Sequence, residues 1–306
     1  MPWPEILAGF LAAAIGVGTP LLLAATGEMI TERSGVINLG VEGAMLAGAL
    51  SAAMGSAAGG PWVGVLTGIL GGLLISAIFA AVSIGLRADQ IITGAALTLL
   101  ATGLTGIVFR RAFGDEGPGI GIPTFEQWDI AGLSDLPVVG QALFGQTVLT
   151  YLAVALVGLS WWVLFRTWWG LSLRACGEGA DAARAAGVPV RWTRTAATMI
   201  GGALAGLGGA TLVLAQVGTF AEEMTAGRGF IAIAIVVLGR WRPAGVLAAS
   251  LLFGGATALQ FLFQAAGTEV PYQWFLMLPY LLALGALAGA AGWGRARAPK
   301  ELGKGG

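Results

Sequence analysis

The sequence predicts an all-α fold, a polytopic membrane helix bundle with about nine transmembrane helices, within a range of about eight to ten. Hydrophobic residues occupy 57% of the 306 positions and charged residues 10%, with a mean hydropathy of +0.83. A soluble domain carries charge on about a quarter of its positions. Apolar runs long enough to cross about 30 Å of hydrocarbon also recur along the whole chain. They leave no room for a sizeable soluble domain.

The apolar runs are separated by charged residues or by Gly and Pro. They cover residues 5–26, 39–54, 62–84, 91–109, 148–165, 196–217, 230–239, 246–263 and 275–293. The first has no Lys or Arg before it, so we expect a retained span and not a cleaved signal peptide. The run at 230–239 is too short to cross alone, which predicts half of a broken helix or an extension by the preceding EEMTAGRG stretch. Residues 1–294 then form one transmembrane domain, followed by a basic tail at 295–306.

Arginine and lysine predict the orientation, because in short loops they are retained on the cytoplasmic side. The loop at 166–195, the RWRP turn at 240–243 and the tail are basic. The loop at 112–147 is acidic and has no basic residue, and 264–274 carries only Glu269. We therefore expect the N-terminus and these two loops outside, and the three basic segments and the C-terminus in the cytoplasm.

Three arginines do not fit this topology. Arg110 and Arg111 lie at the outer end of the fourth run, and Arg228 lies just before the seventh. For Arg110 and Arg111 we favour anchoring at lipid headgroups, and pairing with the acidic loop that follows is the alternative.

Several kinds of chemistry are excluded. The chain has no histidine, which removes imidazole catalysis and the commonest transition-metal ligand. Its one cysteine, Cys176, cannot form an internal disulfide and is expected to be inert. No GxxxxGK[ST] motif occurs, so the chain has no phosphate loop for ATP. Because we also expect no buried carboxylate pair, an intramembrane enzyme is disfavoured, and we expect no catalytic residue, metal or cofactor on this chain.

Glycine is abundant, with 51 residues. Gly68 with Gly72, and Gly202 with Gly206, form small-xxx-small faces that let helix backbones approach closely within lipid. These faces predict a tightly packed bundle.

Two stretches are weakly alike, EMITERSGVINLGVEG at 28–43 and EMTAGRGFIAIAIVVLG at 223–239. Each places acidic residues and then an arginine before a membrane run, and the predicted topology makes them enter from opposite sides. This pattern is typical of an inverted repeat, in which a transport path lies between the repeats. Chance similarity is the alternative.

Polar residues inside the predicted spans are candidates for a solute path. Glu42 lies a few residues into the second run, with Asn38 one helical turn earlier. An ionisable residue inside a membrane is a functional candidate by default, and a structural knot with Arg33 or with helix ends near the inner interface is the alternative. Residues suited to a neutral polar solute are Gln90, Thr93, Gln216, Thr219, Phe220 and Gln260. Phe220 would stack on the solute, and for the five polar residues hydrogen bonding between helices is the alternative.

The segment at 170–194 differs from the other loops. Its ADAARAAG stretch predicts a short Ala-rich helix that stops at Gly187, before Pro189. An ordered helix between two spans is suited to docking a partner, and a plain connecting loop is the alternative.

Three long stretches resemble a known family. ERSGVINLGVEGAMLAGAL (32–50), GLSLRACGEGADAARAAGVPV (170–190) and MTAGRGFIAIAIVVLGRWRPAG (224–245) resemble signature segments of permease subunits in the branched-chain amino acid, ribose and nucleoside group of bacterial ABC importers. Within that group they are most similar to nucleoside or simple-sugar permeases. The resemblance runs in order over most of the chain.

The resemblance implies a multi-pass protein of the bacterial cytoplasmic (inner) membrane. Its partners would be a second homologous permease subunit, an ABC ATPase subunit that binds ATP and Mg, and an extracytoplasmic solute-binding lipoprotein. Residues implied to belong to a coupling helix seated in the ATPase are Arg174, Gly177, Glu178, Ala182, Ala183 and Gly187. Cys176 and Gly179 depart mildly from the family pattern, and a glycine beside Glu178 can loosen the start of this helix.

The resulting hypothesis is a permease subunit that moves a small polar solute, in the first place a nucleoside, by alternating access driven by partner ATPases. Ribose-like sugars and branched-chain amino acids are alternative solutes. The rival class is an ion-coupled secondary transporter, for which the sequence shows little charged relay beyond Glu42.

Overall fold

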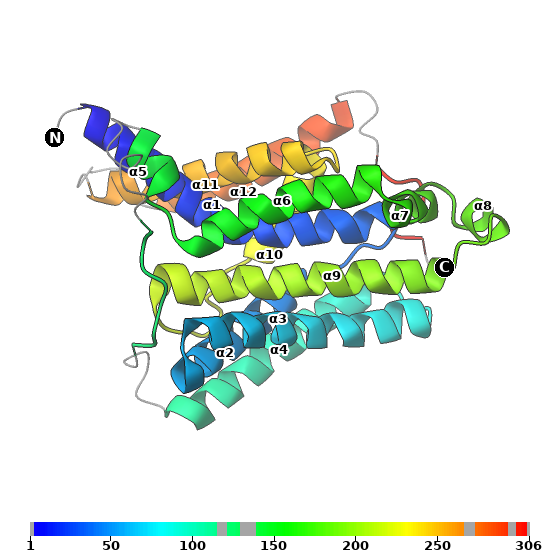
Figure 1. Ribbon diagram of the computed structural model, residues 1–306, viewed down its shortest axis with the longest axis horizontal. Helices are drawn as coiled ribbons and strands as arrows, with labels where there is room; N and C mark the ends of the chain where they lie inside the picture. Colours follow the sequence, from blue (N-terminus) through cyan, green and yellow to red (C-terminus); the bar gives the residue numbers. More distant parts are fainter. Residues whose placement is uncertain (1–2, 115–120, 129–138, 266–272, 293–297, 305–306) are drawn as a thin grey trace.

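The structure is a computed structural model that describes residues 3–114, 121–128, 139–265, 273–292 and 298–304. Its helices are α1 (Trp3–Arg33), α2 (Val41–Gly59), α3 (Pro61–Phe79), α4 (Gln90–Phe113), α5 (Val139–Phe144), α6 (Val148–Arg166), α7 (Trp168–Glu178), α8 (Ala180–Ala185), α9 (Val190–Thr211), α10 (Arg228–Leu238), α11 (Pro243–Ala265) and α12 (Gln273–Gly292). Two π-helical turns, η1 (Ala80–Gly85) and η2 (Leu212–Val217), extend α3 and α9. The long helices form one bundle, and α8 projects from one of its ends (Figure 1).

Among the described residues, seven helices are long and apolar enough to cross a membrane: α1, α2, α3 with η1, α4, α6, α9 with η2, and α11. The predicted all-α polytopic fold is confirmed. α12 adds a helix of 20 residues. α10 has 11 residues, which is about 16 Å of helix and too short to cross alone. The residues before it, 218–227, are not helical. Of the two alternatives predicted for this run, the half helix is therefore the one that the structure shows.

Helix ends differ most from the predicted ranges. α1 continues to Arg33, past the predicted end near residue 26, because EMITER adds polar turns before Gly35 takes a positive φ of 93°. α9 begins at Val190, six positions before the predicted start at 196, through the amphipathic RWTRT turn. The predicted loop at 166–195 therefore contains α7, α8 and the first turn of α9. Hydropathy marks the apolar part of a helix and misses its polar ends.

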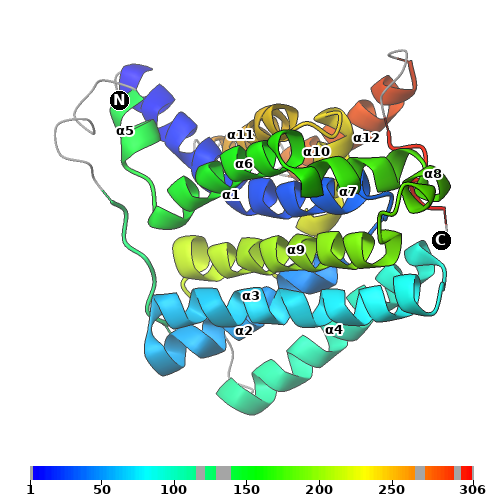
Figure 2. The same ribbon diagram turned by 45° about the vertical axis from the view of Figure 1, so that its right-hand side comes forward.

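The connections at 86–89, 167–189, 239–242 and 298–304 gather at one end of the bundle, called here the α8 end. Glu301 N donates to the Gly177 carbonyl (2.9 Å), Arg33 Nε to the Trp241 carbonyl (2.9 Å) and Arg191 Nη2 to the Gly85 carbonyl (3.0 Å). The N-terminus and α5 lie at the opposite end (Figure 2). The three basic segments that were predicted to share one side of the membrane thus share one end of the bundle.

Two of the three misfit arginines, Arg110 and Arg228, have local partners. Arg110 Nη1 lies 2.5 Å from Glu222 Oε1 in an ion pair whose side chains are both about half exposed. Glu222 belongs to the turns before α10, so these turns supply a partner that the sequence analysis did not name. Asp115, Glu116, Asp129 and Asp135 of the loop at 112–147 lie outside the described residues, and pairing with that loop stays a prediction. Arg228 Nη1 donates to the carbonyls of Met224 (2.8 Å) and Thr225 (3.2 Å), one turn back.

The predicted glycine faces pack against one another. A Cβ added to Gly72 of α3 would lie 2.6 Å from Gly206 Cα of α9, and one added to Gly68 would lie 2.7 Å from Ala210 Cβ. Gly48 of α2 approaches the same point, since a Cβ there would lie 2.5 Å from Gly206 Cα. A real side chain would clash at such distances. The backbones of α2, α3 and α9 are therefore in direct contact at these glycines. This close contact supplies van der Waals attraction that lipid cannot replace.

α2 and α10 start near each other and run to opposite ends. Their first turns meet at Glu42. α2 ends where Ser56 Oγ donates to the Pro123 carbonyl (2.5 Å), and α10 ends beside Trp241, which bonds Arg33. The opposite entry predicted for 28–43 and 223–239 is therefore present in these two segments. A repeat of entire halves of the chain stays a prediction.

Candidate functional site

The buried carboxylate of Glu42 lies where α2 and α10 begin. Its Oε1 accepts hydrogen bonds from Thr225 Oγ1 (2.6 Å) and Gly227 N (2.8 Å), and its Oε2 accepts from Gly229 N (2.5 Å). Unpaired N–H groups at a helix start attract negative charge. These bonds support the structural interpretation of Glu42, with the start of α10 as partner. Arg33 is engaged elsewhere, by Trp241.

α1 carries two further buried carboxylates, one turn apart. Glu28 is 1% exposed and Glu32 is 2% exposed. Glu28 Oε1 accepts from Asn38 N (3.0 Å), and Glu32 Oε2 accepts from Trp241 Nε1. The expectation of no buried carboxylate pair is therefore wrong, because it ended α1 before these residues. Their i, i+4 spacing in EMITER was the available signal.

An open cavity of about 580 Å³ lies between α1, α6, η2 and α11, in the half of the bundle away from α8. None of its described lining residues is acidic. Small residues of α1 form one wall, and Phe261 of α11 contributes an aromatic ring. Its polar lining residues are Gln127, Gln146, Thr147, Thr150, Thr211, Gln216 and Arg228.

Two glutamines of this cavity are held by α1. Gln216 Nε2 donates to the Gly16 carbonyl (2.7 Å), and Gln146 Nε2 donates to the carbonyls of Ala12 (3.2 Å) and Ala142 (2.9 Å). Because the amide NH₂ groups bind the backbone, the side-chain oxygens are the groups left to accept hydrogen bonds from a solute. The cavity can therefore receive hydroxyl and N–H donors without placing a carboxylate near them.

The structure separates most of the predicted solute-path residues. Gln216 lines the cavity. Gln90 borders a different pocket at the α8 end, and its Oε1 accepts from Ile37 N (2.8 Å). Asn38 Oδ1 accepts from Gly40 N (3.0 Å) and shapes the turn before α2. For Gln90 and Asn38 the bonds support the packing alternative.

Three of the four remaining candidates are buried, and Thr219 is partly buried. Phe220 is 1% exposed, and its ring centroid lies 5.0 Å from that of Phe109. Thr93 and Gln260 are buried, and Thr219 Oγ1 lies 3.4 Å from the Phe220 carbonyl. Sequence reasoning missed Gln127, Gln146, Thr150 and Phe261, which reach the cavity from separate parts of the chain. Arg228, noted as a misfit in topology, was the signal that could have drawn attention to this region.

α8 is the short helix expected in the 170–194 segment. It ends at Ala185, after which Gly187 adopts a φ of 84° and Val188 N bonds back to the Ala183 carbonyl (3.0 Å). This is the glycine stop that ADAARAAG predicted. Ala180 and Ala183 pack with Cys176 and Val190 in a small core. α7, a helix of 11 residues that ends just before α8, was not predicted.

Five of the six predicted coupling residues fall into two groups, and Arg174 is partly buried. Glu178, Ala182 and Gly187 are exposed, whereas Gly177 and Ala183 are buried. A Cβ on Gly177 would meet the Arg33 carbonyl oxygen and would lie 3.2 Å from Pro299 Cβ, so packing explains this glycine. The Arg174 guanidinium lies 5.1 Å from the Phe165 ring centroid. The exposed group gives α8 a face that is open to a partner.

A sequence profile of the family described as "Branched-chain amino acid transport system / permease component" matches residues 10–287. The chain belongs to this family. It is therefore a multi-pass permease subunit of an ABC transporter of the cytoplasmic membrane, and its transport is powered by a separate ATPase. Membership of this family excludes the rival class, an ion-coupled secondary transporter.

Three relatives indicate where in the family this permease lies. It is 37% identical to the guanosine ABC transporter permease protein NupQ of Bacillus subtilis over 309 positions, which cover 98% of this chain and 96% of NupQ. It is 37% identical to the nucleoside ABC transporter permease protein NupC of Lactococcus lactis, over 93% of this chain and 92% of NupC. It is 43% identical to the putative glucose ABC transporter permease protein TsgC13 of Haloferax volcanii, over 83% of this chain and 77% of TsgC13. No solved structure matches this permease.

Proposed function

We propose that this permease carries nucleosides into the cell. The observation that carries the proposal is the near full-length similarity to NupQ and NupC, which are named for guanosine and nucleoside transport. The glutamine-lined cavity supports it, because its volume of about 580 Å³ lies within the range of about 300–1,000 Å³ common for small-molecule sites. Amide oxygens, threonine hydroxyls and Phe261 offer hydrogen bonding and ring stacking to a neutral, aromatic, hydroxylated solute.

A simple sugar is the second candidate solute. TsgC13, the most identical of the three relatives described here, is named as a putative glucose permease. Hydroxyl-binding walls serve a sugar as well as the ribose of a nucleoside. The two candidates differ in the base, which would use the ring of Phe261 and the donors of Arg228.

We infer that α8 is the coupling helix, seated in a groove of a partner ATPase on the cytoplasmic side. ATP and Mg bind that partner, whose closure would move α8 and rock the bundle between outward and inward openings. The exposed face of α8 and its fixed ends support this role. A second permease and an extracytoplasmic binding lipoprotein would complete the importer, and NupP and NupQ of one organism, both named guanosine permeases, support the pairing.

Uptake by the reconstituted complex tests the solute. Labelled guanosine, cytidine, ribose, glucose and leucine are supplied with the binding protein and ATP, and we expect the nucleosides to accumulate. Gln216→Ala and Gln146→Ala should each slow nucleoside uptake by about tenfold, the effect of about one lost hydrogen bond. Gln141→Ala, on the exposed face of α5, is the matched control. Glucose uptake without nucleoside uptake would reject the nucleoside proposal.

Coupling is tested separately with Ala182→Trp on the exposed face of α8. A bulky ring there should block seating in the ATPase, so we expect uptake and ATPase co-purification to be lost while membrane insertion is retained. Arg166→Gln, at the same end of the bundle, is the control. Normal uptake by the Ala182→Trp complex would refute coupling through α8.

A further inference from the structure

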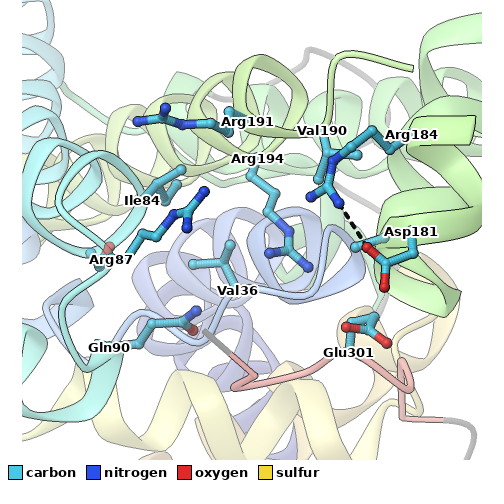
Figure 3. A pocket seen from close by; sticks show the side chains of 12 residues that line it. Val36, Ile84, Arg87, Gln90, Asp181, Arg184, Val190, Arg191, Arg194 and Glu301 are labelled. Atoms are coloured by element: carbon cyan, nitrogen blue, oxygen red, sulfur yellow. Dashed lines mark hydrogen bonds and ion pairs between the residues drawn. The ribbon is translucent and has the colours of Figure 1, made fainter. Parts of the chain in front are cut away.

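A second pocket, of about 340 Å³, opens at the α8 end beside the proposed coupling helix. It lies between the connection from η1 to α4, the turn before α2, α8 and the first turn of α9 (Figure 3). The proposed solute cavity shares no lining residue with it. The transport proposal therefore leaves this pocket without a role.

Four guanidinium groups line the pocket, against two carboxylates. The charged residues are Arg87, Arg184, Arg191, Arg194, Asp181 and Glu301. Asp181 is paired with Arg184 (2.7 Å), and Glu301 lies 3.8 Å from Lys304 in the tail. Glu301 also interacts electrostatically with Arg194. Four arginines against two acids leave the pocket with an excess of positive charge.

One nitrogen of the buried Arg194 guanidinium has no hydrogen-bond acceptor among the described residues. This residue is 4% exposed, and its Nε donates to the Ser34 carbonyl (3.2 Å). Its Nη2 is buried without a hydrogen-bond partner among the described residues. Figure 3 shows Arg194 reaching from α9 into the space between Val36 and Asp181. A buried guanidinium stays charged and needs an acceptor, so the free Nη2 indicates a ligand oxygen.

The surroundings of Arg194 favour an anion. Arg191 and Arg194 lie in the first turns of α9, a helix of 22 residues whose N-terminal N–H groups attract negative charge. Arg87 faces the same space from the η1–α4 connection, where it holds a positive φ of 61°. Within the described part of the chain, Arg87 has no ion-pair partner.

We propose that this pocket binds a phosphate-type anion. A tetrahedral phosphoryl group offers several acceptor oxygens to guanidinium groups that converge from different elements. Bound there, it would bridge Arg87 and Arg194 and tie the η1–α4 connection to α9 next to α8. The group can come from inorganic phosphate or from a lipid headgroup. The proposal does not rest on the identity of the transported solute.

Ligand binding is tested on the full-length chain in lipid-stripped micelles. Inorganic phosphate is titrated against chloride at constant ionic strength while thermal unfolding is followed, and dioctanoyl phosphatidic acid is titrated in a second arm. A saturable rise in Tm is expected with at least one of them, since a ligand that binds only the folded state stabilises it. Phosphate alone points to a free anion, and phosphatidic acid alone points to a lipid headgroup.

Variants then assign the effect to the pocket. Arg87→Gln should weaken the apparent affinity by about tenfold or more, the loss expected for one charge-assisted contact. It should leave the Tm without ligand unchanged, because this exposed side chain holds no other element. Arg166→Gln removes a charge from the same end outside the pocket and should keep full affinity.

The proposal is overturned if neither ligand raises the Tm, or if Arg87→Gln and Arg166→Gln weaken binding equally. It is also overturned if Arg87→Gln abolishes co-purification of the ATPase but leaves phosphate and lipid binding unchanged. The pocket would then be part of the binding surface for the ATPase. Failure of nucleoside uptake alone leaves this binding test untouched.

Discussion

Each hydrogen bond accepted by Glu42 comes from the segment that begins α10, so one side chain joins the starts of two helices that run to opposite ends of the bundle. Thr225, Gly227 and Gly229 would otherwise leave donors unpaired in the interior. A buried donor without an acceptor is destabilising by about 1–3 kcal/mol. The charge of Glu42 is therefore explained by packing before any solute is considered.

Glu42→Gln tests this role. The amide presents an NH₂ group to N–H donors in place of a carboxylate oxygen, so we expect the free energy of unfolding to fall by about 1–3 kcal/mol. Thermal or denaturant unfolding in micelles measures the loss. Glu5→Gln, the same chemical change at an exposed position, is the control. Equal stability of the two variants would contradict the structural assignment.

Cys176 is the second residue whose surroundings decide its chemistry. Its side chain is buried in the small core under α8, and this burial raises the pKa of the Cys176 thiol. A raised pKa leaves less thiolate at a given pH, and the thiolate is the reactive form.

We predict that Cys176 resists maleimide in the folded permease at neutral pH and reacts once the protein is denatured. Mass spectrometry of the alkylated protein, with and without SDS, measures both states. Labelling of the native permease should rise only as the pH approaches the raised pKa. Rapid labelling of native Cys176 at neutral pH would show that the core under α8 is open.

At the scale of elements, glycine contacts set the spacing of α2, α3 and α9. The small-xxx-small pattern identified the two faces, and the structure shows that they pack against each other. α8 was equally predictable, because a glycine stop and a proline mark its end. α7 was not predictable. Its exposed apolar residues, Trp168 and Leu171, make it look in a hydropathy profile like the end of the preceding span.

Gly206→Leu tests the crossing of α3 and α9. The added side chain has no space beside Gly68 and Gly72, so we expect a loss of stability of about 1–3 kcal/mol or more and a lower yield of folded permease. Gly158→Leu is the matched control, because a Cβ there meets nothing within 4 Å. Monodispersity after detergent extraction and the unfolding midpoint measure the effect. A Gly206→Leu protein as stable as Gly158→Leu would refute the crossing.

For the whole molecule, one end of the bundle collects the basic segments, α8 and the C-terminal tail. The tail folds back on this end, where Glu301 N bonds the Gly177 carbonyl and Gly303 N bonds the Gly35 carbonyl (3.3 Å). By the positive-inside rule we expect this end to face the cytoplasm, where ATP is available to a partner.

Thiol accessibility tests this orientation. Ala182→Cys on α8 should react with a membrane-impermeant maleimide only after the membrane is opened, and Gly121→Cys, exposed at the opposite end, should react in intact cells. The buried Cys176 keeps the background low. Reaction of Ala182→Cys from outside would reverse the topology and exclude coupling through α8.

The candidate sites could be predicted only in part. Gln216 was chosen as a polar residue at the end of a run, and the structure places it in the cavity. Gln90 was chosen as a polar residue at the start of a run, Asn38 as the residue one turn before Glu42, and Phe220 for ring stacking. Gln90 and Asn38 instead bond to the backbone, and Phe220 packs on Phe109. Polarity within a span does not distinguish a residue that binds a solute from one that binds a neighbouring helix.

The sequence by itself determined the membrane class, the approximate spans, the clustering of basic loops, the close-packing glycines and the short helix at α8. Each of these features follows from the local composition and the residue spacing within a single segment of the chain. Only the tertiary structure decided that Glu42 caps α10, that Glu28 and Glu32 are buried, and that the arginines at the α8 end surround one pocket. These features join residues far apart in the chain, and their burial depends on which helices meet.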